Sequence, residues 1–194
     1  MNQATAEQVL SEWAYQNDRA IIMPYVASLA STEAFPEDFL SKLYWRTKNE
    51  RLQRRTFPGV EKFSLNWFIQ YFYSRSMVIG IVKPGKIAGY AWMYDVEGSK
   101  FKKGAVGVCF YREFWGNTVL RDLANFGLEW FFKEAGFYTI YGTVASWNLV
   151  SMRFGKLLGF EPCGRLPRFF LQGETFADNH LFALKREDFL GRER

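Results

Sequence analysis

Residues 148–160 read NLVSMRFGKLLGF, a short helical pattern that follows a strand-like run at 138–145. The pattern begins at Asn148, a residue type that caps helices by accepting a hydrogen bond from a backbone N–H within the first turn. Ser151 lies three residues further on, within that turn. The helix is expected to stop at Gly159, because glycine readily adopts the conformation that ends helices. The segment therefore predicts a strand followed by a short capped helix.

A second segment, residues 108–118, reads VCFYREFWGNT. It predicts a strand, a short loop that contains Gly116, and the start of a helix at Thr118. The first backbone N–H groups of a helix have no partner within the helix, and together with the helix dipole they can hold a phosphate or pyrophosphate. An ordinary structural turn remains the alternative interpretation of this segment.

The rest of the chain predicts an α/β (α+β) fold. Three helices are expected in the first seventy-odd residues, at 7–15, 35–49 and 64–73. From Met77 onward the expected order is strand, strand, strand, helix, strand, helix, strand, strand. These elements are expected at 77–82, 87–95, 105–111, 118–135, 138–145, 148–158, 168–172 and 180–185.

The composition of the 194 residues favours one domain, 1–194, with a substantial core. Apolar residues make up 48% and charged residues 23%, as in ordinary globular domains. Aromatic residues reach 19%, so some are expected to line a groove or a partner surface. With two cysteines, Cys109 and Cys163, and one histidine, His180, the chain has too few ligands for a Cys/His zinc site. No metal is therefore expected.

The sequence gives no sign of a membrane or export signal. Glu7, Glu12 and Asp18 interrupt any apolar run near the start of the chain, and the longest apolar runs, such as 77–82, have the length of a strand. We therefore expect a cytoplasmic protein with no membrane partner. The net charge of +5 suits an acidic ligand but is weak evidence for nucleic-acid binding.

In this order and at this separation, the two segments resemble the GCN5-related N-acetyltransferase (GNAT) family. The resemblance is carried by Asn148 and Ser151 as N-x-x-S, by Leu-Gly-Phe at 158–160, and by the Phe-Trp-Gly-Asn-Thr loop at 114–118. It is greatest to the branch that acetylates ribosomal-protein N-termini and related amines. The tail at 178–188 looks like the final strand of that branch.

The resemblance implies a mixed central sheet with helices on both faces. Two neighbouring parallel strands, 105–111 and 138–145, would splay apart to admit acetyl-CoA. Residues 77–188 would form the acetyl-CoA-binding core, and the helical part at 1–76 would form the acceptor side.

The same resemblance implies a set of cofactor contacts. Backbone groups of Cys109 and Tyr111 would pair with the pantetheine and polarise the thioester carbonyl, and residues 112–118 would hold the pyrophosphate. Asn148 would bind the pantetheine arm. The full set implied is Cys109, Phe110, Tyr111, Arg112, Phe114, Trp115, Gly116, Asn117, Thr118, Asn148, Ser151 and Phe154.

The implied reaction is direct transfer of acetyl to a primary amine, which is a small amine, a peptide N-terminus or a lysine. Ser151 is the candidate acid for the leaving thiolate, because the tyrosine that many family members place seven residues after the asparagine is replaced by Gly155. The base is open among Asp95, Glu97, His180 and a relayed water, while Glu113 is expected too close to the pyrophosphate loop to reach an amine. Direct transfer is favoured over an acyl intermediate on Cys109.

Two departures keep other functions open. Thr118 replaces the second glycine of the loop, and together with Gly155 it suggests a catalytically degenerate family member with a binding or structural role. The basic run 42–55, with Tyr44, Trp45 and Trp67 nearby, suggests instead a solvated helix face or a site for an acidic or nucleic-acid partner. The acceptor stays open, and so does the choice between monomer and homodimer.

Overall fold

The structure is a computed structural model, which describes residues 16–25, 39–73, 75–83, 85–95, 101–172 and 174–192. The chain forms two compact units built from interleaved segments. The first unit takes Met1–Gln53, Lys62–Trp92 and Val108–Gly127, and the second takes Arg54–Glu61, Met93–Gly107 and Leu128–Arg194. The helix predicted at 7–15 lies outside the described residues.

The first unit holds strands in the order β1-β2-β3-β4, and β3 and β4 also run into the second unit. The bounds are Ala20–Tyr25 for β1, Ser76–Val82 for β2, Lys86–Asp95 for β3 and Lys103–Phe110 for β4. The expected strands at 77–82, 87–95 and 105–111 are thus confirmed to within two residues. β1 pairs antiparallel with β2 along its whole length.

β1 corrects the prediction that the first seventy-odd residues are helical. Ala20 and Ile22 alternate into the core, where they are 0% and 1% exposed, as a half-buried strand requires. Pro24 has no N–H to donate, which suits the edge position that β1 occupies. The strand has only six residues, too few for its alternation to be distinguished from a helical pattern.

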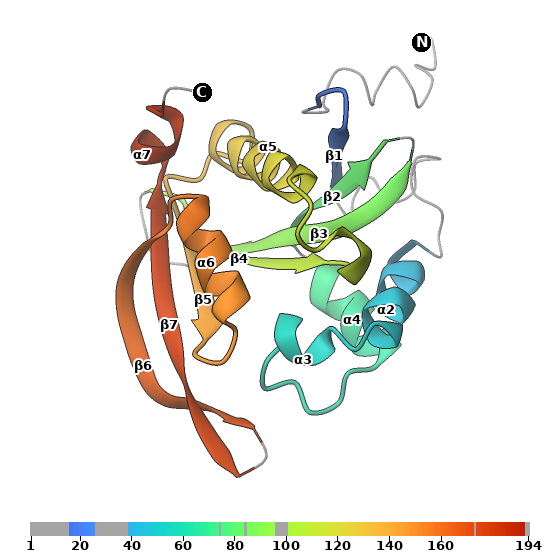
Figure 1. Cartoon of the computed structure of the whole chain (residues 1–194), viewed down its shortest axis with the longest axis vertical. Coiled ribbons are helices and arrows are strands. Elements are labelled where there is room, and N and C mark those ends of the chain that lie inside the picture. Colours follow the sequence, from blue (N-terminus) through green and yellow to red (C-terminus); the bar gives the residue numbers. More distant parts are fainter. Residues whose placement is uncertain are drawn as a thin grey trace. The chain divides into compact units, whose positions relative to one another are not determined.

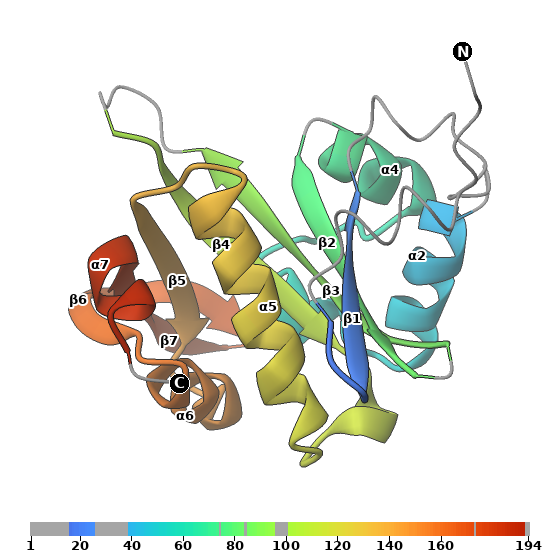
Figure 2. The same ribbon diagram turned by 90° about the horizontal axis from the view of Figure 1, so that it is seen from above.

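Helices cover both faces of the sheet in the first unit, as Figure 2 shows. On one face, α2 (Phe39–Asn49) and α4 (Leu65–Tyr73) bury an aromatic cluster, in which Phe68 and Phe72 pack against Tyr90 of β3. On the other face lies α5 (Val119–Lys133), whose Leu123 side chain packs against the sheet at Gly80 of β2. The aromatic run at 63–72 thus contributes Phe68 and Phe72 to the core, since both are 0% exposed.

The second unit holds the strand order β4-β5-β7-β6 (Figure 1). β4 and β5 (Thr139–Ala145) are parallel, and their register ends at Val106 and Gly142 although β4 runs on to Phe110. β7 (Thr175–Lys185) pairs antiparallel with both β5 and β6 (Glu161–Gln172). The expected mixed sheet with splayed parallel strands is confirmed.

α6 (Leu149–Leu157) follows β5 and ends at Gly159, whose φ of 86° only glycine adopts without strain. Three short elements were not predicted, because each is too short to show a periodic pattern: α3 (Gln53–Thr56), the 3₁₀ helix η2 (Arg112–Phe114) and α7 (Arg186–Leu190). In the part of the chain that the structure describes, no helix is both long and apolar enough to cross a membrane.

The β6–β7 hairpin is longer than predicted and contains an irregularity. The register shifts between Leu166 and Phe170, and Arg168 within that shift has a φ of 52°. Asp178 on β7 holds the irregular stretch: its Oδ1 accepts from Arg168 N at 2.8 Å, and its Oδ2 accepts from Arg165 Nε at 2.8 Å. Extra residues that bend a strand hide the simple alternation on which sequence prediction depends.

The contacts of Asp178 therefore predict that the stability of the β6–β7 hairpin depends on pH. The hydrogen bond from Arg168 N, and then the Arg165 guanidinium, lower the pKa of Asp178 below its ordinary 3.8. A lowered folded-state pKa adds stability above the unfolded pKa, and this stability is lost as the pH falls through the folded value. Asp178→Asn should lower Tm near neutral pH. The difference in Tm between the variant and wild type should become smaller below about pH 4. A difference that stays constant from about pH 6 to about pH 2.5 would contradict this account.

Candidate active site

Cys109, near the end of β4, and Tyr111, which directly follows β4, lie in a buried polar cluster of the first unit. The cluster also contains the hydroxyls of Thr47 and Tyr90. The exposed fractions of Cys109 and Tyr111 are 3% and 0%. Thr47 donates to the carbonyl of Leu43, so Tyr90 donates to Thr47 Oγ1 across 2.8 Å. Burial, and then the nearby Cys109 thiol, raise the pKa of Tyr90 and of Tyr111. Both phenols are thus neutral near pH 7, and burial keeps the Cys109 thiol from acting as an accessible nucleophile.

The backbone at the end of β4 alternates in direction. Tyr111 N donates to the carbonyl of Ala88 on β3 at 2.9 Å, so this N–H is used inside the sheet. Because successive residues of a strand point to opposite sides, the N–H and carbonyl of Phe110 face away from β3. The Phe110 carbonyl accepts from Trp115 Nε1 at 2.9 Å, which turns the loop back onto the strand.

The loop 112–118 presents backbone donors at the start of α5. Gly116 has a φ of 81°, a conformation that favours glycine. Asn117 Oδ1 accepts from Val119 N at 3.0 Å and so caps the helix. Within the described residues, the N–H groups of Gly116 and Thr118 have no hydrogen-bond acceptor. Two such donors at the positive end of a helix suit a phosphate group.

Arg19, which the sequence analysis missed, also lies at this loop. Its Nη1 donates to Thr118 Oγ1 at 3.1 Å, and its Nη2 pairs with Asp122 on α5. The side chain is 55% exposed. No local pattern could reveal this contact, because 99 residues separate Arg19 from Thr118.

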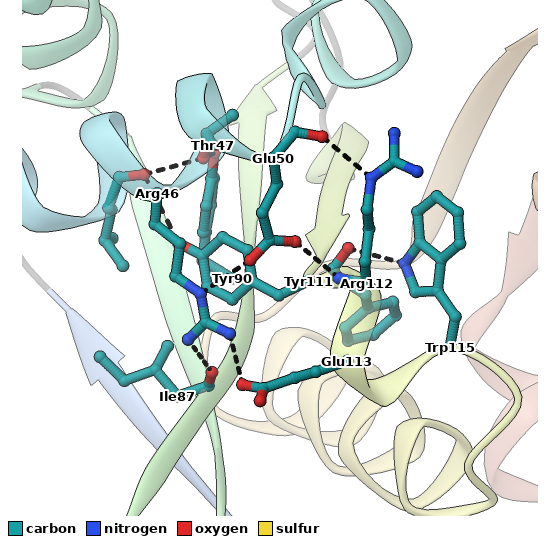
Figure 3. Close-up of polar contacts among 11 residues, drawn as sticks. Arg46, Thr47, Glu50, Ile87, Tyr90, Tyr111, Arg112, Glu113 and Trp115 are labelled. Atoms are coloured by element: carbon teal, nitrogen blue, oxygen red, sulfur yellow. Dashed lines mark hydrogen bonds and ion pairs between the residues drawn. The ribbon is translucent and has the colours of Figure 1, made fainter.

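The loop is also attached to the end of α2, as Figure 3 shows. Glu50, in the turn after α2, accepts from Arg112 N at 2.7 Å. Arg46 donates to Glu50 Oε1 at 2.9 Å and pairs with Glu113. Arg46 is thus paired with two carboxylates, those of Glu50 and Glu113. It is therefore not part of an unpaired basic helix face in the run 42–55.

In the second unit, Asn148 caps α6 as predicted. Its Oδ1 accepts from Ser151 N at 3.4 Å, and the residue is 8% exposed. Nδ2 of Asn148 and the hydroxyl of Ser151, which is half-buried, have no partner among the residues that the structure describes. Phe154 lies one turn further along the helix and is also half-buried. α6 thus brings Asn148, Ser151 and Phe154 together, while residues 109–118 are brought together in the first unit.

The structure also places the candidate bases. Asp95 is exposed at the end of β3, and Glu97 lies outside the described residues. Glu113 pairs with Arg46. His180 lies on β7, which lies between β5 and β6. Among the described side chains, no three His, Cys, Asp or Glu residues are grouped so that they could hold a metal ion.

Comparisons with known proteins give a consistent picture. A family model described as an acetyltransferase (GNAT) domain matches residues 6–161. No curated protein matches the chain in sequence. Many solved structures share the fold, and three of them illustrate it.

A ribosomal-protein-S5-alanine acetyltransferase from Vibrio fischeri has 17% identity and a TM-score of 0.66, over 91% of this chain and 98% of that one. A spermidine N-acetyltransferase from Vibrio cholerae, in complex with CoA and spermine, has 15% identity and a TM-score of 0.69, over 87% and 98%. The putative acetyltransferase yncA from Salmonella typhimurium, with acetyl-CoA, has 14% identity and a TM-score of 0.63, over 85% and 92%.

Proposed function

The chain belongs to the acetyltransferase (GNAT) domain family, and we propose that it transfers an acetyl group from acetyl-CoA to a primary amine. The observation that carries the proposal is the loop 112–118, where Gly116 and Thr118 leave backbone N–H groups without acceptors at the start of α5. Donors of this kind fit a pyrophosphate.

The proposed cofactor contacts follow the residues present. The loop 112–118 holds the pyrophosphate, and Asn148 Nδ2, which lacks a partner in the described part of the chain, donates to the pantetheine arm. Tyr111 N–H is bonded to the carbonyl of Ala88, so another backbone donor at the end of β4 takes the role of polarising the thioester carbonyl. The other residues of the predicted set support these contacts at two places, the end of β4 with the loop 112–118, and α6. They are Cys109, Arg112, Phe114, Trp115, Asn117 and Phe154.

Acetyl-CoA supplies an activated acyl group, and the chain's own residues have three tasks. A base takes a proton from the ammonium form of the acceptor, because only the neutral amine is a nucleophile. A hydrogen-bond donor stabilises the oxyanion as the new N–C bond forms. As the C–S bond breaks, the new amide nitrogen releases its second proton to solvent, and Ser151 gives a proton to the thiolate, directly or through a water, and regains one from solvent.

The acceptor class is proposed to be a primary amine. The two Vibrio proteins of similar fold are named for acetylation of alanine in ribosomal protein S5 and of spermidine. We propose that the protein acts in the cytoplasm. A second candidate function is favoured by Gly155, which stands where many family members have the tyrosine that acts as general acid. In this alternative the chain binds acetyl-CoA without turnover.

An assay of CoA thiol release separates the two candidates. Spermidine, an alanine-initiated peptide and a lysine peptide serve as acceptors, and mass spectrometry identifies the acetylated amine. Turnover with at least one amine supports the enzyme. Binding of acetyl-CoA with no amine-dependent thiol release supports the second candidate.

For Ser151→Ala we expect kcat to fall about a hundredfold with little change in KM, because loss of a proton donor affects mainly the transition state. Gly155→Tyr in the same background should recover part of the loss, since a side chain at 155 would first meet Phe160 at an ordinary 4.0 Å. Val150→Ala, at a site 67% exposed on the same helix, is the control. A kcat that is unchanged in Ser151→Ala refutes the role of this hydroxyl.

A further inference from the structure

The turn after α2 supplies the loop 112–118 with a capping group that the loop lacks. η2 begins at Arg112, and its N-cap residue Tyr111 makes no side-chain capping bond. Glu50 takes this role from another part of the chain, because its Oε2 accepts from Arg112 N at 2.7 Å (Figure 3). The main-chain oxygen of Glu50 also accepts from Arg112 Nε at 2.9 Å. One residue therefore fixes both the main chain and the side chain at the start of the loop.

Arg46 fixes the carboxylate of Glu50 in turn. Its Nε donates to Glu50 Oε1, and its Nη1 donates to the carbonyl of Ile87, both at 2.9 Å. Its Nη2 pairs with Glu113, and its guanidinium carbon lies 3.8 Å from the centre of the Tyr111 ring. A planar guanidinium that is bonded along its edges and stacked on its face has little freedom left.

We propose that Glu50 is a positioning residue for the loop 112–118 and that Arg46 holds Glu50 in place; this inference rests on the proposed binding of acetyl-CoA. A charged acceptor on Arg112 N sets the direction in which the chain leaves β4. The N–H groups of Gly116 and Thr118 then point the same way before and after binding. A loop that is already ordered loses less entropy when a ligand binds.

The charges of Arg46, Glu50 and Glu113 predict which substitution weakens CoA binding more. Glu50 and Glu113 place two carboxylates beside a loop proposed to hold a pyrophosphate, and Arg46 pairs with both and offsets part of their negative charge. Removal of Glu50 loosens the loop but takes away a negative charge. Removal of Arg46 loosens the loop and leaves two carboxylates to repel the ligand. Arg46→Met should therefore weaken CoA binding more than Glu50→Ala does.

The test uses the full chain, with CoA as the probe. Glu50→Ala should lower the calorimetric affinity about tenfold and raise KM for acetyl-CoA, with kcat within about twofold of wild type. Glu50→Gln is nearly isosteric, keeps one acceptor oxygen and should lose less affinity. Without ligand, hydrogen exchange at the amide of Arg112 should be faster in Glu50→Ala. The matched control is Glu61→Ala, at an exposed glutamate with no partner among the described residues.

An affinity for CoA in Glu50→Ala equal to that in Glu61→Ala would overturn the proposal, as would unchanged exchange at Arg112. If Glu50→Ala fails to fold, the same two measurements on Glu50→Gln decide. If the wild-type protein does not bind CoA, the proposed function fails, and the exchange measurement without ligand still decides whether Glu50 fixes the loop.

Discussion

Gly89→Ala should destabilise the protein by at least about 3 kcal/mol, the upper end of the usual cost of overpacking. A Cβ at Gly89 would lie 2.9 Å from Phe110 Cα and far inside contact distance of the Cys109 carbonyl oxygen. Both are backbone atoms, so no side-chain rotation relieves the contact. β3 and the end of β4 must instead move apart, and Tm should fall by about 6–12 °C.

Gly142→Ala is the matched control, because it adds the same methyl group to a strand glycine that has space. Its Cβ would meet Phe160 at an ordinary 3.9 Å. Stability should stay the same or rise by less than about 1 kcal/mol, since alanine loses less backbone entropy on folding than glycine. Thermal unfolding of both variants checks the comparison, and similar Tm values would show that the close approach of β3 and β4 at Gly89 is wrong.

Asn148→Ala should lose both stability and cofactor affinity. The loss of the cap on α6 costs about 1 kcal/mol, and the loss of the Nδ2 donor should weaken acetyl-CoA binding about tenfold. The two roles belong to different atoms of one side chain. Oδ1 accepts from Ser151 N, while Nδ2 has no partner in the described residues.

Asn148→Asp separates these roles. Aspartate keeps a capping oxygen and lacks the N–H donor, so Tm without ligand should match wild type while the shift of Tm caused by acetyl-CoA becomes smaller. Asn148→Ala should lose both. If the ligand-induced shift in Asn148→Asp equals that of wild type, the Nδ2 group does not contact the cofactor and only the structural role of Asn148 remains.

The sequence predicted those parts of the fold that repeat over a turn or more. α5 buries Val119, Leu120, Leu123 and Leu128 at helical spacing, and Asn148 and Gly159 delimit α6 where the pattern predicted. β1 escaped prediction because six residues carry too little alternation. In β6 the shift between Leu166 and Phe170 breaks the alternation itself.

The site was only partly predictable, for a different reason. The resemblance predicted cofactor contacts at the loop 112–118 and at Asn148, because their residues are local in sequence, and these contacts stay a proposal. The contacts of Glu50 with Arg112 and of Arg19 with Thr118 span 62 and 99 residues, so no local pattern reveals them. In the basic run, composition alone did not show that Glu50 and Glu113 neutralise Arg46, because Glu113 is 67 residues away.

A calorimetric titration of the full wild-type chain with acetyl-CoA tests the central claim most directly. The account predicts saturable binding with an affinity in the micromolar range, about −8 kcal/mol. CoA should compete for the same site. Absence of binding at millimolar acetyl-CoA, with a normal unfolding transition, would contradict the assignment of the loop 112–118 and Asn148 to this cofactor.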